Sequence, residues 1–139
     1  MEGPKSIFDP NLDPVLELQR AAARARMLKK NILIEIGADW CTWCHRLESF
    51  IVSHSELYLL RAENFIHVRV HSGEGAELPA VFQNLPPFDG IPHYFVYSPE
   101  GQLLHSQDTE LLEEGETYNY GKVWDFLSFW GVDSSAKLH

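Results

Sequence analysis

The sequence predicts a single α/β domain in which helices cover both faces of a mixed central β-sheet. Segments with helical spacing of apolar residues alternate along the chain with short β-branched runs, which is typical of α/β proteins. Near the C-terminal end, two apolar runs flank Ser98-Pro99-Glu100-Gly101, a turn sequence that indicates a β-hairpin and hence an antiparallel part of the sheet. The length of 139 residues fits one domain, so we assign residues 1–139 to it.

The first half of the pattern begins with an N-terminal helix over about residues 14–30. Asp13 and Pro14 precede a stretch rich in Ala, Leu, Glu and Arg, which are strong helix formers, and proline suits the first helical turn. The next run, residues 32–36, is short, β-branched and almost wholly apolar. Such a run predicts a strand that is covered on both faces.

The remaining elements follow from periodicity and from turn residues. Helical spacing predicts helices over 44–53, 55–62, 77–84 and 122–130. Alternation and β-branched residues predict strands over 64–71, 94–97 and 102–105. An acidic loop of about residues 108–120 joins the hairpin to the last helix, and the core of the domain spans about residues 32–130.

The charge of the chain is strongly negative and unevenly distributed. The net charge is −9, from 11 basic and 20 acidic residues. Nucleic-acid binding needs a basic surface, so we exclude nucleic acid as a partner. The segment between Val70 and Gly121 holds no Lys or Arg but nine acidic residues: Glu74, Glu77, Asp89, Glu100, Asp108, Glu110, Glu113, Glu114 and Glu116.

Membrane and export signals are the next features to consider. No apolar run reaches the roughly eighteen residues that a membrane span requires, so we expect no membrane span. The first residues, 1–5, contain no apolar stretch typical of a signal peptide. We therefore expect either a cytoplasmic protein or an exported protein whose leader is missing from this sequence.

The two cysteines, Cys41 and Cys44, lie where the first strand gives way to a helix. A thiolate at a helix N-terminus is stabilised by free backbone N–H groups and by the helix dipole, which lowers the pKa of the first cysteine. The second cysteine is one helical turn away, so the pair can close a disulfide and resolve a mixed disulfide. His45 lies on the same helical face as Cys41, where its protonated form would favour the thiolate, or it is a solvated residue of the first turn.

On these residues the chain resembles the thioredoxin-fold thiol–disulfide oxidoreductases. The sequence Trp40-Cys41-Thr42-Trp43-Cys44 is similar to the family's Trp-Cys-x-x-Cys site. Gly90-Ile91-Pro92 precedes the hairpin strand, where the family places a cis-proline loop against the cysteines. Glu35 lies six residues before the first cysteine, where thioredoxins place a buried acidic proton relay. The resemblance covers about residues 32–130 and implies a thioredoxin-like fold.

The resemblance also implies roles for individual residues. Cys41 would be the exposed nucleophile, Cys44 the shielded resolving thiol, and Glu35 the group that accepts the proton of Cys44. The loop at the proline would pair with an extended substrate peptide beside the cysteines. The substrate-binding residues implied in this way are Trp40, Trp43, Ile91 and Pro92.

The sequence departs from the family pattern at several places. Thr42 and Trp43 stand where thioredoxins usually carry Gly-Pro, and Glu35 stands where they carry Asp. The family's first strand is not evident before the opening helix. The segment from Asp108 to Tyr120 is longer than usual and resembles an insertion found in some bacterial thioredoxin-like proteins.

Several of these residues have a second interpretation. Glu35 is flanked by apolar residues, which suits a buried proton acceptor, but it is also placed to be a strand-end carboxylate that reaches solvent. Pro92 is either cis or a trans proline that begins a strand. His93 either lies near Cys41 and tunes its pKa or is an ordinary strand-end histidine. Trp40 and Trp43 form the rim of the substrate groove or belong to the core.

The same residues could also belong to a haem attachment site or to a zinc site. Cys41 to His45 also matches the Cys-x-x-Cys-His motif of c-type haem attachment, but the strand before it and the proline loop fit the thioredoxin fold better. A zinc site would need four ligands, which two cysteines and His45 do not supply. The other histidines lack ligand spacing, and His67 shares with Arg69 and His71 a strand face that we expect to be solvated: no metal site is predicted.

The sequence analysis therefore predicts a small thiol–disulfide oxidoreductase that needs no cofactor besides its own Cys41–Cys44 disulfide. Expected partners are protein thiols and disulfides and an upstream redox partner, and we expect a monomer. The alternative is a non-catalytic, chaperone-like binding module of the same fold. Because the chain has no cysteine beyond the pair, and because similar bacterial proteins are often exported, a periplasmic location is favoured over a cytoplasmic one.

Overall fold

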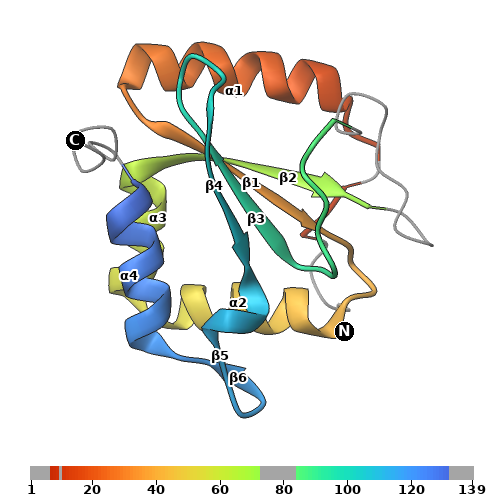
Figure 1. The fold of residues 1–139 in the computed structure, drawn as a ribbon, viewed down its shortest axis with the longest axis vertical. Helices are drawn as coiled ribbons and strands as arrows, with labels where there is room; N and C mark the ends of the chain where they lie inside the picture. The colour runs from red at the N-terminus through yellow and green to blue at the C-terminus, as the bar shows by residue number, and fades with distance from the viewer. Residues whose placement is uncertain (1–6, 10, 73–83, 132–139) are drawn as a thin grey trace, which may run out of the picture.

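A four-stranded mixed sheet forms the centre of the molecule (Figure 1). The computed structural model describes residues 7–9, 11–72 and 84–131. The strands lie in the order β2-β1-β3-β4. Strand β1 pairs in parallel with β2 and antiparallel with β3, which pairs antiparallel with β4. This arrangement confirms the predicted mixed sheet. The strands are β1 (Asn31–Gly37), β2 (Phe65–His71), β3 (His93–Tyr97) and β4 (Leu103–Asp108).

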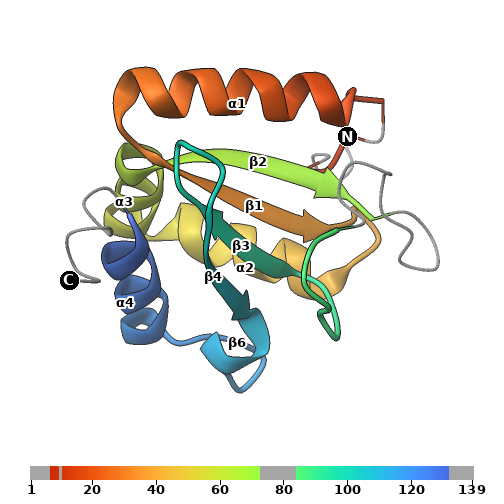
Figure 2. The ribbon, with the colours of Figure 1, turned by 45° about the horizontal axis from the view of Figure 1, so that its top comes forward.

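Helices cover the sheet on both faces, as the sequence predicts (Figure 2). Helix α1 (Pro14–Leu28) packs on one face, and α2 (Thr42–Ser53), α3 (Ser55–Asn64) and α4 (Tyr120–Trp130) pack on the other. All seven residues of β1 are buried, because this strand is central and its two faces are both covered. Ile32, Ile34 and Ile36 face α1, whereas Leu33 lies in the cluster formed with α2, α3 and α4.

The bounds of α1 show how local chemistry sets the ends of a helix. The Asp13 carboxylate accepts hydrogen bonds from the N–H groups of Val15 and Leu16, which caps the helix N-terminus. At the other end Lys29 adopts a left-handed conformation with φ of 57°, so the helix ends at Leu28. The predicted helix over 14–30 is therefore confirmed with a C-terminal end two residues earlier.

The acidic segment after the hairpin differs from the sequence prediction. It contains the 3₁₀ helix η2 (Thr109–Leu112) and a two-stranded hairpin of β5 (Glu113–Glu114) and β6 (Thr117–Tyr118), so the expectation of a plain loop is wrong. Two apolar side chains explain the order, because Leu112 and Tyr118 are buried in the core beneath α2 and α4. The predicted helix over 77–84 lies outside the described residues except for Asn84, which is in a turn.

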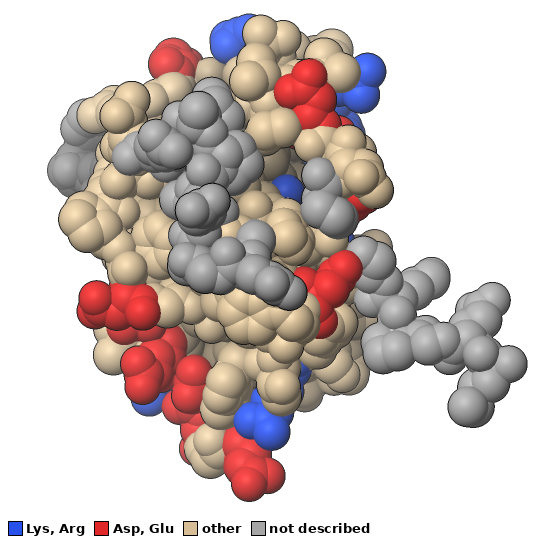
Figure 3. Space-filling model, turned by 90° about the vertical axis from the view of Figure 1, so that its right-hand side faces the viewer, with Lys and Arg blue, Asp and Glu red and all other residues tan. Residues whose placement is uncertain are grey.

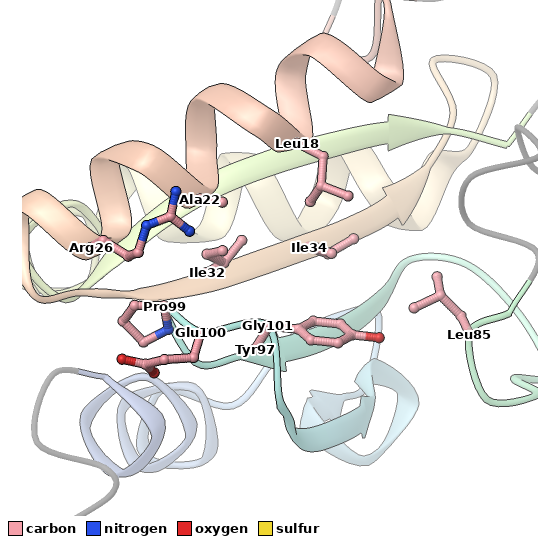
Figure 4. Close-up of a pocket in the computed structure, with 10 residues that line it drawn as sticks. All are labelled: Leu18, Ala22, Arg26, Ile32, Ile34, Leu85, Tyr97, Pro99, Glu100 and Gly101. Atoms are coloured by element: carbon pink, nitrogen blue, oxygen red, sulfur yellow. The ribbon is translucent and has the colours of Figure 1, made fainter.

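An apolar cavity of about 290 Å³ lies between α1 and the β3–β4 turn (Figure 4). Leu18 and Ala22 of α1 line one side, and Tyr97 of β3 lines the opposite side. Arg26 and Glu100 bring opposite charges to one end of the cavity. The cavity is on the α1 face of the sheet, whereas Cys44 belongs to α2 on the other face.

Candidate active site

Cys41 occupies the residue immediately before α2, where the sequence places a reactive cysteine. Its Sγ accepts a hydrogen bond from the Cys44 backbone N–H at 3.1 Å, so the sulfur itself caps the helix. Cys44 lies in the first turn of α2 and points toward the same cluster as Cys41. Both cysteines are free thiols in this structure.

The two thiols differ less in exposure than the sequence analysis expects. Cys41 is 6% exposed and Cys44 is 0% exposed, so the expectation that Cys41 is an exposed nucleophile is wrong. The reason is the packing around it: Phe8, Ala38 and Ile91 form an apolar cluster with the cysteine pair. Cys44 is nevertheless the more shielded of the two sulfurs.

The pKa values of the two thiols are shifted in opposite directions. A hydrogen bond from the Cys44 thiol, together with backbone N–H groups of Cys44 and Trp43 and the charge of His45, lowers the pKa of Cys41 to about 7, against the opposing effect of burial. The hydrogen bond to Cys41 and burial raise the pKa of Cys44. At pH 7 about half of the Cys41 side chains are therefore thiolate, while Cys44 stays protonated.

His45 lies close to the cysteines, but its ring is held by the backbone. Its Nε2 donates to the Asp39 carbonyl oxygen at 2.6 Å, and the residue is half-buried. The positive charge of its protonated form contributes to the lowered pKa of Cys41. The structure thus places His45 where the helical spacing predicts it. The hydrogen bond to the Asp39 carbonyl oxygen could not be predicted from that spacing.

The proline loop lies directly against Cys41. The Ile91–Pro92 peptide bond is cis, and the Cys41 thiol donates to the Ile91 carbonyl oxygen at 3.7 Å. The Thr109 hydroxyl donates to the Pro92 carbonyl oxygen, which joins η2 to the loop. The structure therefore brings Cys41, Ile91 and Pro92 together, as the resemblance implies.

The two tryptophans of the motif occupy different environments. Trp40 is 58% exposed, whereas Trp43 is half-buried and packs against the core. The Trp43 ring meets Tyr118 edge-on, with ring centroids 5.5 Å apart, and the Arg46 guanidinium lies 4.6 Å above it. Trp40 thus presents an exposed ring, and Trp43 links the cysteine pair to the acidic insertion.

A groove of about 200 Å³ adjoins the proline loop and is bordered by carboxylates. Asp108, Glu110 and Glu113 line it on the side of the insertion, and Asp89 lines it on the side of the loop. Burial and then repulsion from Glu110 and Asp108 raise the pKa of Glu113. Figure 3 shows acidic side chains gathered on the lower left of this end of the molecule. We call this hollow, with Trp43 and the proline loop as its other wall, the acidic groove.

Glu35 is buried beneath α2, and its partner is a residue that the sequence analysis assigns elsewhere. Glu35 is 1% exposed, and its Oε1 accepts a hydrogen bond from His67 Nε2 at 2.7 Å. The alternative in which Glu35 reaches solvent is therefore wrong. The charge of Glu35 also contributes to the raised pKa of Cys44, so the carboxyl lies near the Cys44 thiol.

The face of β2 that carries His67 is only partly solvated, because the side chain of His67 is 17% exposed and that of Arg69 is 31% exposed. His67 and Arg69 lie opposite Leu33 and Glu35 of β1 in the register of the parallel pair, on the face covered by α2 and α3. The alternation in β2 predicts one buried and one solvated face, but the second face is largely covered as well. Helices cover both faces, and most polar groups of this layer bond with one another, although the Arg69 Nε and the Tyr94 hydroxyl have no hydrogen-bond partner among the described residues.

A second carboxylate completes this buried polar layer. Glu48 of α2 accepts hydrogen bonds from Arg61 of α3, at 2.7 Å, and from Arg69 of β2. These two guanidinium groups hold the pKa of Glu48 below its usual value against the effect of burial. The sequence gives one indication of this network. Acidic and basic residues of α2, α3 and β2 stand next to apolar residues in the chain.

His93 is turned away from the cysteine pair. It is 6% exposed, its Nε2 bonds with the Ser106 hydroxyl at 2.8 Å, and its ring packs with Phe88 and Phe95 on the α1 face of the sheet. Burial lowers the pKa of His93. The structure therefore does not bring His93 to Cys41.

An N-terminal segment contributes to the site, and the sequence patterns do not predict this contribution. The backbone N–H groups of Ile7 and Phe8 donate to the Asp39 carboxylate at 2.9 and 3.0 Å. Phe8 is fully buried and belongs to the apolar cluster around the cysteines. Gly37 makes room for it, because a Cβ there would lie 2.4 Å from the Phe8 ring and 2.9 Å from the Cys44 Sγ.

The described residues contain neither a cluster of metal ligands nor a membrane-spanning helix. Within them, no three His, Cys, Asp or Glu side chains gather as they would to hold a metal ion. No helix among residues 7–9, 11–72 and 84–131 is long and apolar enough to span a bilayer.

Solved structures with a similar fold include a disulphide isomerase, an oxidoreductase and a DsbD domain. A disulphide isomerase from Xylella fastidiosa Temecula1 matches with a TM-score of 0.75 and 23% identity, covering 91% of this chain and 97% of that one. The DsbH oxidoreductase matches with a TM-score of 0.60 and 19% identity over 100% and 94% of the two chains. The oxidised C-terminal domain of DsbD from Neisseria meningitidis matches with a TM-score of 0.56 and 17% identity over 85% and 93%.

Sequence comparison points to the same fold. The human spermatogenesis-associated protein 20 is 31% identical over 64 residues, which are 46% of this chain and 8% of that protein, so the chain spans a small part of this relative. The model of a family described as thioredoxin-like matches residues 13–99, more than half of the chain, including both cysteines and the cis proline. With a mixed sheet, a cysteine-capped helix and this match, the chain belongs to the thioredoxin-like family.

Proposed function

We propose that this protein carries out thiol–disulfide exchange on protein substrates, with Cys41 as the attacking nucleophile and Cys44 as the resolving thiol. The observation that carries the proposal is the Cys41 sulfur, which caps α2, accepts a hydrogen bond from the Cys44 N–H and has a pKa lowered to about 7. A nucleophilic thiol attacks best when its pKa lies near ambient pH. The names of the structural relatives, an isomerase and an oxidoreductase, support the same class.

The exchange consists of two displacements at sulfur. The Cys41 thiolate attacks one sulfur of a substrate disulfide, forms a mixed disulfide and expels the other substrate sulfur as a thiolate. Cys44 then loses its proton and attacks the Cys41 sulfur, which closes the Cys41–Cys44 disulfide and expels the second substrate thiolate. The substrate gains the two electrons that the cysteine pair loses. An upstream redox partner returns the pair to the dithiol form by the reverse exchange.

The surrounding residues would support these two steps. Glu35 is buried near Cys44, where it can accept the proton that the resolving thiol must lose. The backbone at Ile91 and Pro92 lies against the Cys41 sulfur and can pair with an extended segment of the substrate. The exposed ring of Trp40 supplies an apolar contact for the same segment.

Reduction of a model disulfide protein tests this function. We expect the dithiol form of the wild type to reduce it catalytically, Cys41→Ser to be inactive, and Cys44→Ser to accumulate mixed disulfides through Cys41. Ser49→Ala, a change of comparable size on the same helix, is the control and should retain activity. Equal rates for the wild type and Cys41→Ser would contradict the proposal and support a non-catalytic binding module instead.

The direction of catalysis follows from the redox potential of the pair. Titration of the Cys41–Cys44 couple against glutathione buffers measures this potential and separates a reductase from an oxidase or an isomerase. Trapping with Cys44→Ser identifies the protein substrates and the upstream partner in the same material. Sedimentation of the reduced protein tests the expected monomer.

A further inference from the structure

The resolving step needs an exit for a proton from the interior. Cys44 is 0% exposed and Glu35 is 1% exposed, so neither the thiol nor the carboxyl that would deprotonate it meets solvent directly. Glu35 has to release each proton that it takes before it can act in the next cycle. The contacts of Glu35 therefore decide how the proton leaves.

His67 is the contact that leads outward. Its Nε2 lies 2.7 Å from Glu35 Oε1, and no other hydrogen bond to the Glu35 side chain is found among the described residues. The His67 side chain is 17% exposed, whereas that of Glu35 is 1% exposed. The imidazole thus joins a sealed carboxyl to a region of partial solvent contact, and it has two nitrogens with which to do so.

The two guanidinium groups near His67 are matched by two carboxyl groups, so the positive charge of a protonated His67 is not needed for balance. Glu48 of α2 is held by Arg61 of α3 and Arg69 of β2, so one carboxylate faces two guanidinium groups and Glu35 supplies the second negative charge. Tyr94 of β3 lies across from Glu35 in the register of the sheet, and burial raises the pKa of its hydroxyl well above the usual value, so it stays neutral. Burial, opposed by the hydrogen bond to Glu35, lowers the pKa of His67.

We propose that His67 is a positioning residue for Glu35, which orients the carboxyl toward the buried thiol and exchanges its proton with solvent. This inference rests on the proposed function. In each reductive cycle Cys44 gives its proton to Glu35, the Cys44 thiolate displaces the substrate sulfur, and the Glu35–His67 pair loses one proton through the imidazole. The reverse transfer re-protonates Cys44 when the upstream partner reduces the disulfide.

The two displacements can be followed separately with Ellman's reagent. One molar equivalent added to the dithiol protein releases a first coloured thiolate when Cys41 attacks and a second when Cys44 resolves the mixed disulfide. We expect His67→Gln, which keeps a hydrogen-bond donor but cannot carry a proton, to slow the second release at least about tenfold near neutral pH and to leave the first within about twofold. The rate of the second release in this variant should rise steadily with pH, as hydroxide takes over the deprotonation.

Two further variants separate a proton-transfer role from a structural one. His105→Gln is the matched control, because His105 lies on β4, bonds with Gln107 and stacks on Trp130 away from the thiols. It should leave both releases unchanged. The double variant Glu35→Gln/His67→Gln should resolve no more slowly than Glu35→Gln alone, since His67 acts through Glu35. An unchanged second release in His67→Gln, or equal slowing of both releases, would overturn the proposal.

A measurement on the wild type covers the case in which the variant folds poorly. The titration of the His67 imidazole by NMR should differ between the dithiol and disulfide forms, because Cys44 carries a proton in only one of them. Identical titrations in the two forms would contradict the role of His67. Release of both thiolates by the wild type supports the proposed function whatever His67 does, whereas release of only one would contradict that function itself.

Discussion

The Cys41 sulfur owes its low pKa mainly to a neighbouring side chain. The hydrogen bond from the Cys44 thiol is the largest contribution, ahead of the two backbone N–H groups and the charge of His45. The pair is therefore reciprocal, because the same bond raises the pKa of Cys44 and keeps that thiol protonated.

Removal of that hydrogen bond gives a prediction at the residue scale. We expect alkylation of Cys41 in the wild type to rise with pH through a midpoint at about 7 and Cys44→Ala to shift the midpoint upward. If the pKa reached the free value of about 8.5, the thiolate fraction at pH 7 would fall from about half to roughly 3%. The pH dependence of iodoacetamide labelling measures this. An unchanged midpoint would mean that the helix terminus alone stabilises the thiolate.

Gly37 gives a second prediction at this scale. Gly37→Ala would place a Cβ against the buried Phe8 ring and the Cys44 Sγ, so we expect the free energy of unfolding to fall by about 1–3 kcal/mol. Gly90→Ala is the matched control, because no described atom beyond the two neighbouring residues lies within 4 Å of a Cβ at that position. Urea denaturation of the two variants provides the comparison. Equal stabilities would show that the Phe8 contact yields without cost.

At the scale of elements, the Thr109 side chain joins η2 to the proline loop. Thr109 is 2% exposed, and its hydroxyl is the described group that donates to the Pro92 carbonyl oxygen. We expect Thr109→Val to destabilise the fold by about 1–3 kcal/mol, since it leaves a buried acceptor without its donor. It should also raise KM for a peptide disulfide more than it lowers kcat, because the wall of the groove is no longer fixed.

Thr117→Val on β6 serves as the control for that substitution, because Thr117 is exposed. Thermal unfolding and steady-state kinetics of both variants give the two readouts. If the two variants have equal KM values, the Thr109 hydroxyl does not position the loop.

Most of the elements could be predicted from local pattern, and the exceptions have physical causes. Apolar period and turn residues are short-range signals, so they locate α1, β1 and the β3–β4 hairpin to within a few residues. The 3₁₀ helix and small hairpin of the insertion follow from the burial of Leu112 and Tyr118 against distant residues. A local pattern does not contain that information.

The candidate site divides in the same way. Cys41, Cys44 and Pro92 are recognisable because their spacing and order are themselves the signal. The contact of Glu35 with His67 depends on the pairing of β1 with β2 across 32 positions, and on α2 and α3 covering a face that carries polar residues. The contribution of Phe8 depends on tertiary packing alone. These contacts could not be found without the strand register and the helix positions.

The whole molecule concentrates negative charge beside its reactive sulfur. Four acidic residues line the groove, and none of the other described residues that line it is Lys or Arg. Opposite charge speeds diffusional encounter, and salt screens this effect over a Debye length of about 8–10 Å. We expect added salt to slow the reaction with a disulfide peptide of basic flanks severalfold and to leave that with a neutral peptide nearly unchanged.

Neutral variants test whether the groove, rather than the net charge, is responsible. Glu110→Gln/Glu113→Gln should reduce the rate with the basic peptide, whereas Glu56→Gln/Glu63→Gln, which removes two exposed charges from α3, should not. Stopped-flow rates over a range of salt concentrations measure both. The same loss in the two double variants would assign the steering to the overall charge of −9.

The acidic groove also bears on encounters between two copies of the protein. An oxidised and a reduced copy would have to bring two such grooves together before the sulfurs could meet, and each copy also carries a net charge of −9. Like charges at close range oppose that encounter. If the proposed function holds, we therefore expect exchange of electrons between an oxidised and a reduced copy to be slower than exchange with a basic partner.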